Sequence, residues 1–280
     1  MSENDQAVRM RKMAYFHCFR AIVWREAQRF VHQRGRFIAA LVRPVVWLTI
    51  FAAGLRPLLE LSVNPPYSAG VSYETYITPG LLGMIQLFNG MQSSLSMVYD
   101  REMGNMRTLL VSPFPRWFLL MSKLAGGVFV SLLQVYAFLL IAWLWGVHLP
   151  VAGYVAVLPV LVLTGFMLGS VGLALSSGIR QLENFAGVMN FVIFPAFFLS
   201  SALYPLSQMQ EANSIIYAIS LANPFTHAVE LIRFALLLQV QWTALALVTV
   251  YCAAFICLAL LAYTPARGLT FRPGSMRRQG

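Results

Sequence analysis

Few side chains in this sequence have the types and spacing needed for catalysis. The four histidines are scattered, and none belongs to an H-E-x-x-H pair that could bind zinc. Neither lysine, Lys12 or Lys123, follows the glycines of a phosphate-binding loop, and no G-x-S-x-G turn presents a serine nucleophile. The three cysteines indicate neither a disulfide framework nor a metal site. We therefore predict no catalytic residue, no metal and no cofactor bound by this chain.

Charged chemistry gathers instead in the segment YDREMGNMRTLLVSPFPR, residues 99–116, between two uncharged runs. Asp100 can cap a helix start, and Glu102 adds a negative charge in the first turn. A helical apolar stripe follows, and Pro113 and Pro115 end it. We predict a short amphipathic helix that offers an apolar edge to a partner; the alternative is a helix lying on lipid headgroups. Its candidate contact residues are Asp100, Arg101, Glu102, Met106, Arg107, Leu109, Leu110 and Pro113.

A second unusual segment covers residues 204–240. Its two apolar pieces, 214–222 and 225–238, are split by Asn223-Pro224, and each is too short to cross a membrane. This pattern predicts a re-entrant or interfacial helical hairpin covered by protein. Within it, an i,i+3 pair of opposite charges either neutralises charge near the interface or lines a pathway or outer gate. The candidate residues are Tyr204, Pro205, Asn223, Pro224, Glu230 and Arg233.

The composition is that of a membrane protein. The chain is 59% hydrophobic and only 11% charged, with a mean hydropathy of +0.68. Long apolar runs without strand-like alternation favour helices over a membrane barrel. Each of the uncharged runs exceeds the roughly 20 residues that a spanning helix needs, and they cover residues 75–99, 124–147, 149–179, 184–210 and 234–266.

A further span is predicted at residues 37–59. Its apolar stretch, 44–55, is short, but Arg43 and Arg56 can reach toward opposite membrane surfaces with their long side chains. The fold class is therefore an all-α polytopic membrane protein with six transmembrane helices in one domain, residues 37–263.

Lysine and arginine counts predict the orientation. The first 36 residues hold eight of these cations, and residues 99–123 and 264–280 hold four each, whereas residues 60–74 and 148–152 hold none. Both termini and the 99–116 segment are thus expected in the cytoplasm. Residues 1–36 are predicted to form an amphipathic elbow helix in the cytoplasmic leaflet, and 264–280 a basic tail. The net charge of +10 follows from this asymmetry, so we expect membrane lipids and no nucleic acid as partners.

Three stretches, in this order, resemble the permease subunit of a type-2 ATP-binding-cassette (ABC) exporter. They are DREMGNMRTLLVSPFPRWFLLMSK at 100–123, FPAFFLSSALYPLSQM at 194–209 and ANPFTHAVELIR at 222–233. The last is similar to the family's Asn-Pro-x-Thr-x-x-x-Glu-x-x-Arg pattern. Ser201-Ala202 departs from the Ser-Gly common in the second stretch.

The resemblance implies a permease that pairs with a second copy or a paralogue and with two separate ATPase subunits, which would bind ATP and magnesium. Residues 99–116 would be the coupling helix that docks on an ATPase. The chain would be a non-enzymatic, multi-pass protein of the cell inner (plasma) membrane that exports a lipid-linked, glycan or hydrophobic drug-like substrate. A secondary carrier and a polytopic membrane enzyme are the alternatives, although we find no carboxylates within the uncharged spans and no catalytic set to support either.

Overall fold

The computed structural model describes residues 3–32, 34–59, 72–102, 113–179 and 181–263. Every regular element within these ranges is an α-helix, which confirms the predicted all-α class. The helices are α1 (Glu3–His32), α2 (Arg34–Leu59), α3 (Tyr73–Glu102), α5 (Arg116–Leu144), α6 (Val151–Gly178), α7 (Leu182–Phe198), α8 (Leu206–Ala212), α9 (Ser214–Ala222), α10 (Pro224–Leu236) and α11 (Trp242–Ala262).

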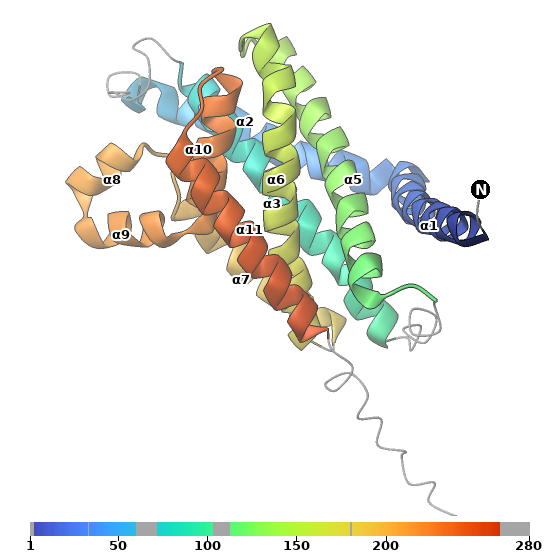
Figure 1. Cartoon of the computed structure of the whole chain (residues 1–280). Helices are drawn as coiled ribbons and strands as arrows, with labels where there is room; N and C mark the ends of the chain where they lie inside the picture. The colour runs from blue at the N-terminus through green and yellow to red at the C-terminus, as the bar shows by residue number, and fades with distance from the viewer. Residues whose placement is uncertain (1–2, 33, 60–71, 103–112, 180, 264–280) are drawn as a thin grey trace, which may run out of the picture.

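Helices α3 and α6 form the centre of the bundle. Helix α6 packs along both α3 and α11, while α5 and α10 contact α3 and α6 from other sides (Figure 1). The short helices α8 and α9 project to one side, whereas α1 packs on α5 at the opposite side. The one-sided position of α8 and α9 keeps them at the margin of the bundle.

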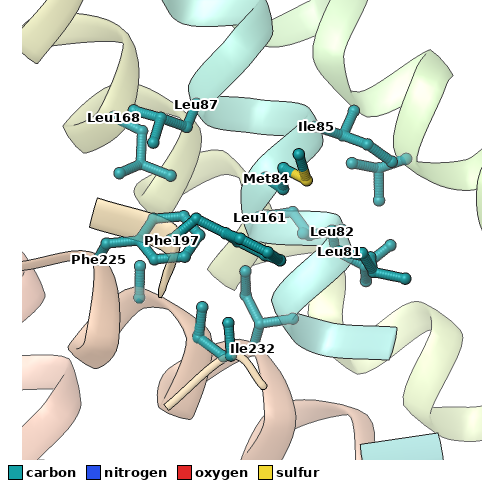
Figure 2. Close-up of a cluster of buried hydrophobic side chains, with 14 of the residues drawn as sticks. Leu81, Leu82, Met84, Ile85, Leu87, Leu161, Leu168, Phe197, Phe225 and Ile232 are labelled. Carbon is teal, nitrogen blue, oxygen red and sulfur yellow. The ribbon is translucent and has the colours of Figure 1, made fainter. Parts of the chain in front are cut away.

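The core is a continuous layer of aliphatic and aromatic side chains. Figure 2 shows Leu81 and Met84 of α3, Leu161 of α6, Phe197 of α7 and Phe225 of α10 converging on one region, and all five are buried. Because uncharged side chains fill this centre, the few charged groups inside the bundle stand out.

Small residues bring α3 and α6 close together. A Cβ added at Gly90 of α3 would lie 2.7 Å from the Cα atom of Gly169 on α6. Small residues at such contacts let the backbones of membrane helices approach closely. Gly165 and Gly169 of α6 form a G-x-x-x-G spacing, which is typical of close helix packing, and the contact at Gly169 fits this pattern.

Three helices are long and apolar enough to cross a membrane: α5, α6 and α11. Helices α9 and α10 pass the same test only as a pair, bent by 77° at Asn223. The apolar parts of α2 and α7 are shorter, and this survey covers the described residues alone. A polytopic helical protein is therefore supported, while the count of six spans stays a prediction.

The segment 99–116 differs in part from the sequence prediction. Helix α3 runs without a break to Glu102, so Asp100 lies in its last turn and does not begin a new helix. Met106, Arg107, Leu109 and Leu110 lie outside the described residues. Pro113 is exposed in a bend, and Pro115 directly precedes α5. Glu102 and Arg101 thus extend the rod formed by α3, and the role of the segment as a coupling helix stays a prediction.

Candidate functional site

The predicted break at Asn223-Pro224 separates α9 from α10, as expected from the sequence. Asn223 accepts a hydrogen bond from the backbone N–H of Phe225 at 3.0 Å and so caps α10, and Pro224 occupies the first turn of that helix. An asparagine cap followed by proline is a strong helix start, because the fixed φ of proline suits the first turn. The sequence therefore begins a new helix here rather than continuing α9.

The same asparagine ties this corner to α7. Its Nδ2 donates to the carbonyl oxygens of Ala196 at 2.8 Å and Leu199 at 2.7 Å. These carbonyls lie at the C-terminal end of α7, where the last turn of a helix leaves acceptors unsatisfied. One side chain thus caps one helix at its start and another at its end.

Glu230 and Arg233 lie on α10 and form the predicted i,i+3 ion pair, in which Arg233 Nη1 donates to Glu230 Oε1. Both residues are buried, at 5% and 2% exposure. The pair is therefore enclosed by protein rather than exposed at a solvated surface, and its role as interfacial charge or as part of a gate stays a prediction.

Arg233 also joins α10 to α3 and to the turn after α7. Its Nη2 donates to the Ser201 carbonyl at 2.7 Å and, more weakly, to the Tyr76 carbonyl at 3.4 Å. The guanidinium carbon lies 4.0 Å from the centroid of the Tyr76 ring, and Tyr76 Oη donates to the same Ser201 carbonyl at 2.9 Å. A planar guanidinium can stack and donate at once, which an ammonium cannot do in this geometry.

Neighbouring contacts hold the turn after α7 against the start of α3. Tyr73 Oη donates to the Leu203 carbonyl at 3.2 Å. Ala202 is fully buried, and a Cβ added at Gly80 would lie 2.8 Å from the Cβ atom of Ala202. Gly80 on α3 therefore makes the room that a glycine at position 202 would otherwise have provided.

The remaining predicted hairpin residues do not join this cluster. Tyr204 is partly exposed, at 36%, and Pro205 is the cap of α8, where its carbonyl accepts from Met209 N at 3.2 Å. The structure thus brings Glu230 and Arg233 together with α3, places Asn223 at the end of α7, and leaves Tyr204 at the surface.

Sequence reasoning missed Tyr73, Tyr76 and Ser201 as partners of the charged pair. The two tyrosines are spaced i,i+3 at the start of an apolar run, and this was the available signal that they share a face. It did not reveal which element that face would meet.

A second polar group lies deeper in the bundle and was also missed. Gln86 Nε2 on α3 donates to the Leu161 carbonyl at 2.6 Å, and Thr164 Oγ1 on α6 donates to Gln86 Oε1 at 2.7 Å. Beside it, a cavity of about 20 Å³ is lined by Ser94, Lys123 and other residues of α3, α5 and α6. Buried polar groups of this kind fix the register of packed helices when their hydrogen bonds are satisfied.

No arrangement among the described residues suits metal binding, because no three His, Cys, Asp or Glu side chains gather there. The candidate site can instead hold a charge pair inside an apolar bundle and join three separate elements through it. The contacts of this cluster hold α3, α10 and the turn after α7 together. A relative movement of these three elements would therefore break or rearrange the hydrogen bonds of Arg233.

Comparison with known proteins agrees with this membrane architecture. YbhR of Escherichia coli strain K12, described as a probable multidrug ABC transporter permease, is 30% identical over 193 residues, which cover 66% of this chain and 51% of YbhR. The putative transport permease ycf38 of Cyanophora paradoxa is 28% identical over 204 residues, 70% of this chain and 66% of that protein. The ycf38 protein of Pyropia yezoensis is 25% identical over 232 residues, 80% of this chain and 75% of that protein.

The chain spans about half the length of YbhR. Residues 17–237 match the family described as ABC-2 type transporter, and this range includes the 99–116 segment, Asn223-Pro224 and the Glu230–Arg233 pair. Because the match covers most of the chain, this protein belongs to the ABC-2 type transporter family.

Proposed function

We propose that this chain is the permease subunit of an ABC exporter, working with a second permease, identical or a paralogue, and two separate ATPase subunits. The observation that carries the proposal is the family match over residues 17–237, which includes both charged segments singled out in the sequence. ATP and magnesium would bind on the ATPases, since this sequence has no phosphate-binding loop.

The proposed mechanism uses α3 to connect the two ends of the bundle. Its 30 residues make one helix about 45 Å long. It ends at Glu102, within the 99–116 segment, and Tyr76, near its start, contacts Arg233. Movement of the ATPases against residues 99–116 would therefore be transmitted along α3 to the Arg233 cluster, which we propose as part of an outer gate.

Direction and cargo are also proposals. The printed name of YbhR describes a probable multidrug permease, and we extend to this chain a hydrophobic drug-like, lipid-linked or glycan cargo moved outward. Aromatic side chains exposed on α7, Phe191, Phe194 and Phe198, offer apolar surface for such cargo or for a second permease copy.

The proposed location is the cell inner (plasma) membrane, with six spans and both termini in the cytoplasm. Single cysteines at positions 6 and 64 should react with an impermeant maleimide from opposite sides of the membrane. Burial raises the pKa of the Cys18 thiol and slows its labelling, but Cys257 is exposed, so a variant lacking the three native cysteines is the right background. Labelling of both positions from one side would disprove this topology.

Reconstitution tests the function itself. The tagged chain, purified from its native membrane with any ATPase subunit that accompanies it, should move a hydrophobic fluorescent dye in proteoliposomes only when ATP is supplied. Dye movement by the chain alone, driven by an ion gradient, would favour a secondary carrier. Conversion of the dye or of a lipid by the purified chain would favour a membrane enzyme.

A further inference from the structure

Arg43 of α2 faces a cavity of about 60 Å³ between α2, α3 and α5. On this scale one water needs about 10–15 Å³, so the cavity has room for several waters or for a group with several oxygens. Its walls carry polar as well as apolar side chains, and the polar ones are Arg43, Asn89, Gln92 and Gln134.

Arg43 is available for a ligand. Its guanidinium carbon lies 3.8 Å from the centroid of the Phe88 ring, and the residue is exposed. It makes no hydrogen bond or ion pair with any described residue, in contrast to Arg233. Stacking on a ring occupies the face of the guanidinium and leaves the N–H groups along its edge free to donate.

The cavity lies beside the middle of α3 and not at either end of that helix. Phe88 is 15 residues from Tyr73 and 14 from Glu102, about 22 Å and 21 Å along α3. The sequence prediction placed Arg43 at a membrane surface, and the depth of Arg43 in the membrane stays a prediction. A cation on a helix of a membrane bundle is costly to keep without a partner, and such residues mark binding sites and pathways.

A second polar side chain points to a ligand independently. Gln134 of α5 lines the cavity, is 4% exposed, and has no hydrogen-bond partner among the described residues. A buried amide without a partner costs free energy unless a water or ligand completes its hydrogen bonds. Asn89, from α3, donates only a long bond of 3.4 Å to the Gly127 carbonyl.

The lining is therefore rich in donors. Arginine supplies a planar fork that matches two oxygens of a phosphate or carboxylate, and the amides of Asn89 and Gln134 add neutral donors. No described acidic residue lines the cavity. Around this polar centre, Met84, Ile85 and Phe88 supply apolar walls suited to the start of an acyl chain.

We propose that this cavity binds the phosphate group of an anionic amphiphile, with Arg43 as its charged ligand and Gln134 as a neutral donor. If the proposed transport function holds, the site names the cargo class as phosphate-bearing amphiphiles. Binding itself rests on the cavity alone and does not require that function.

Binding is tested on the purified full chain in detergent, without ATPase or ATP, by native mass spectrometry or by titration. The probes are phosphatidic acid and diacylglycerol with the same acyl chains, so that they differ only in the phosphate. We expect phosphatidic acid to bind and diacylglycerol to bind at least about tenfold more weakly.

Arg43→Gln should weaken phosphatidic acid binding about tenfold or more, and Gln134→Leu by a smaller factor. The matched control is Arg25→Gln, which removes an exposed arginine paired with Glu26 on α1 and should bind as the parent chain does. Arg43→Lys keeps the charge without the planar fork, so its affinity for phosphatidic acid should lie between those of the parent chain and Arg43→Gln.

Two results would overturn the proposal: equal binding of the two lipids, or equal losses in Arg43→Gln and Arg25→Gln. If inorganic phosphate displaces phosphatidic acid, the site also accepts a soluble anion. If it does not, the site recognises the phosphate only as part of a lipid headgroup. Should Arg43→Gln fail to fold, phosphatidic acid binding by Gln134→Leu and Arg43→Lys is compared with that of Arg25→Gln instead. Losses no greater than in Arg25→Gln would overturn the proposal. Because no ATP is present, failure of this binding test leaves the transport proposal intact. Failure of the reconstituted transport test likewise leaves the binding proposal intact.

Discussion

The guanidinium of Arg233 lies over the ring of Tyr76, 4.0 Å from its centroid, although the two residues are 157 positions apart in the chain. This contact joins α10 to α3 through the planar faces of both side chains. It gives the buried Glu230–Arg233 pair a partner on the helix that leads to the 99–116 segment. The contact therefore links the two charged regions of the sequence through one element.

Glu230→Gln should destabilise the protein markedly. The change leaves a buried guanidinium without its carboxylate, and such losses cost about 3–5 kcal/mol. Thermal unfolding of the purified chain in detergent should show a clearly lowered midpoint. The double variant Glu230→Gln, Arg233→Met should recover part of the loss, since it removes the unpaired charge. A parent-like midpoint in the single variant would contradict the pairing.

Asn223→Ala should lower stability by about 2–4 kcal/mol, because it removes a helix cap and two bonds to the end of α7. Asn213→Ala is the matched control: Asn213 caps α9 but is exposed and makes only that cap. The control should lose about 1 kcal/mol. Similar losses in the two variants, measured by unfolding in detergent, would show that the link to α7 contributes little.

Gly90→Ala should disturb the packing of α3 on α6. The added methyl group would meet the backbone of Gly169, and overpacking of this kind costs about 1–3 kcal/mol. Gly187→Ala on α7 meets nothing within 4 Å and should be neutral or slightly stabilising. If both variants unfold at the parent temperature, the close approach of α3 and α6 at Gly90 contributes little to the free energy of unfolding.

Leu109→Asp tests the coupling segment, whose middle lies outside the described residues. If the apolar stripe docks on an ATPase, a buried carboxylate should lower the docking constant by orders of magnitude. The variant should still insert in the membrane but lose its co-purifying ATPase and ATP-driven transport. Gln210→Asp, exposed on the short helix α8, adds the same charge on the proposed outer side and should keep both. Normal ATPase binding by Leu109→Asp would refute the docking role.

Local patterns predicted the helical architecture well. Uncharged runs anticipated α3, α5, α6 and α11, and Asn223-Pro224 anticipated the corner between α9 and α10. These features depend on residues close in sequence, such as caps and apolar stretches. The i,i+3 pairing of Glu230 with Arg233 was predicted for the same reason and is confirmed.

Features that depend on distant residues were not predicted. No local signal shows that Tyr76 meets Arg233 or that Arg43 stacks on Phe88, because each contact is created by the packing of separate helices. The helix start expected at Asp100 failed because α3 simply continues through it.

The contact between Gly90 and Gly169 divides α3 unequally, about 18 Å from Glu102 and about 26 Å from Tyr73 along the helix. If α3 tilts about this point as a stiff lever, the arm toward Tyr73 is about 1.4 times the arm toward Glu102. A small displacement at the Glu102 end then becomes a larger, opposite one at Tyr76. The glycine contact would then be the pivot of α3. Its place along the helix would determine both the direction and the relative size of the displacement at the far end.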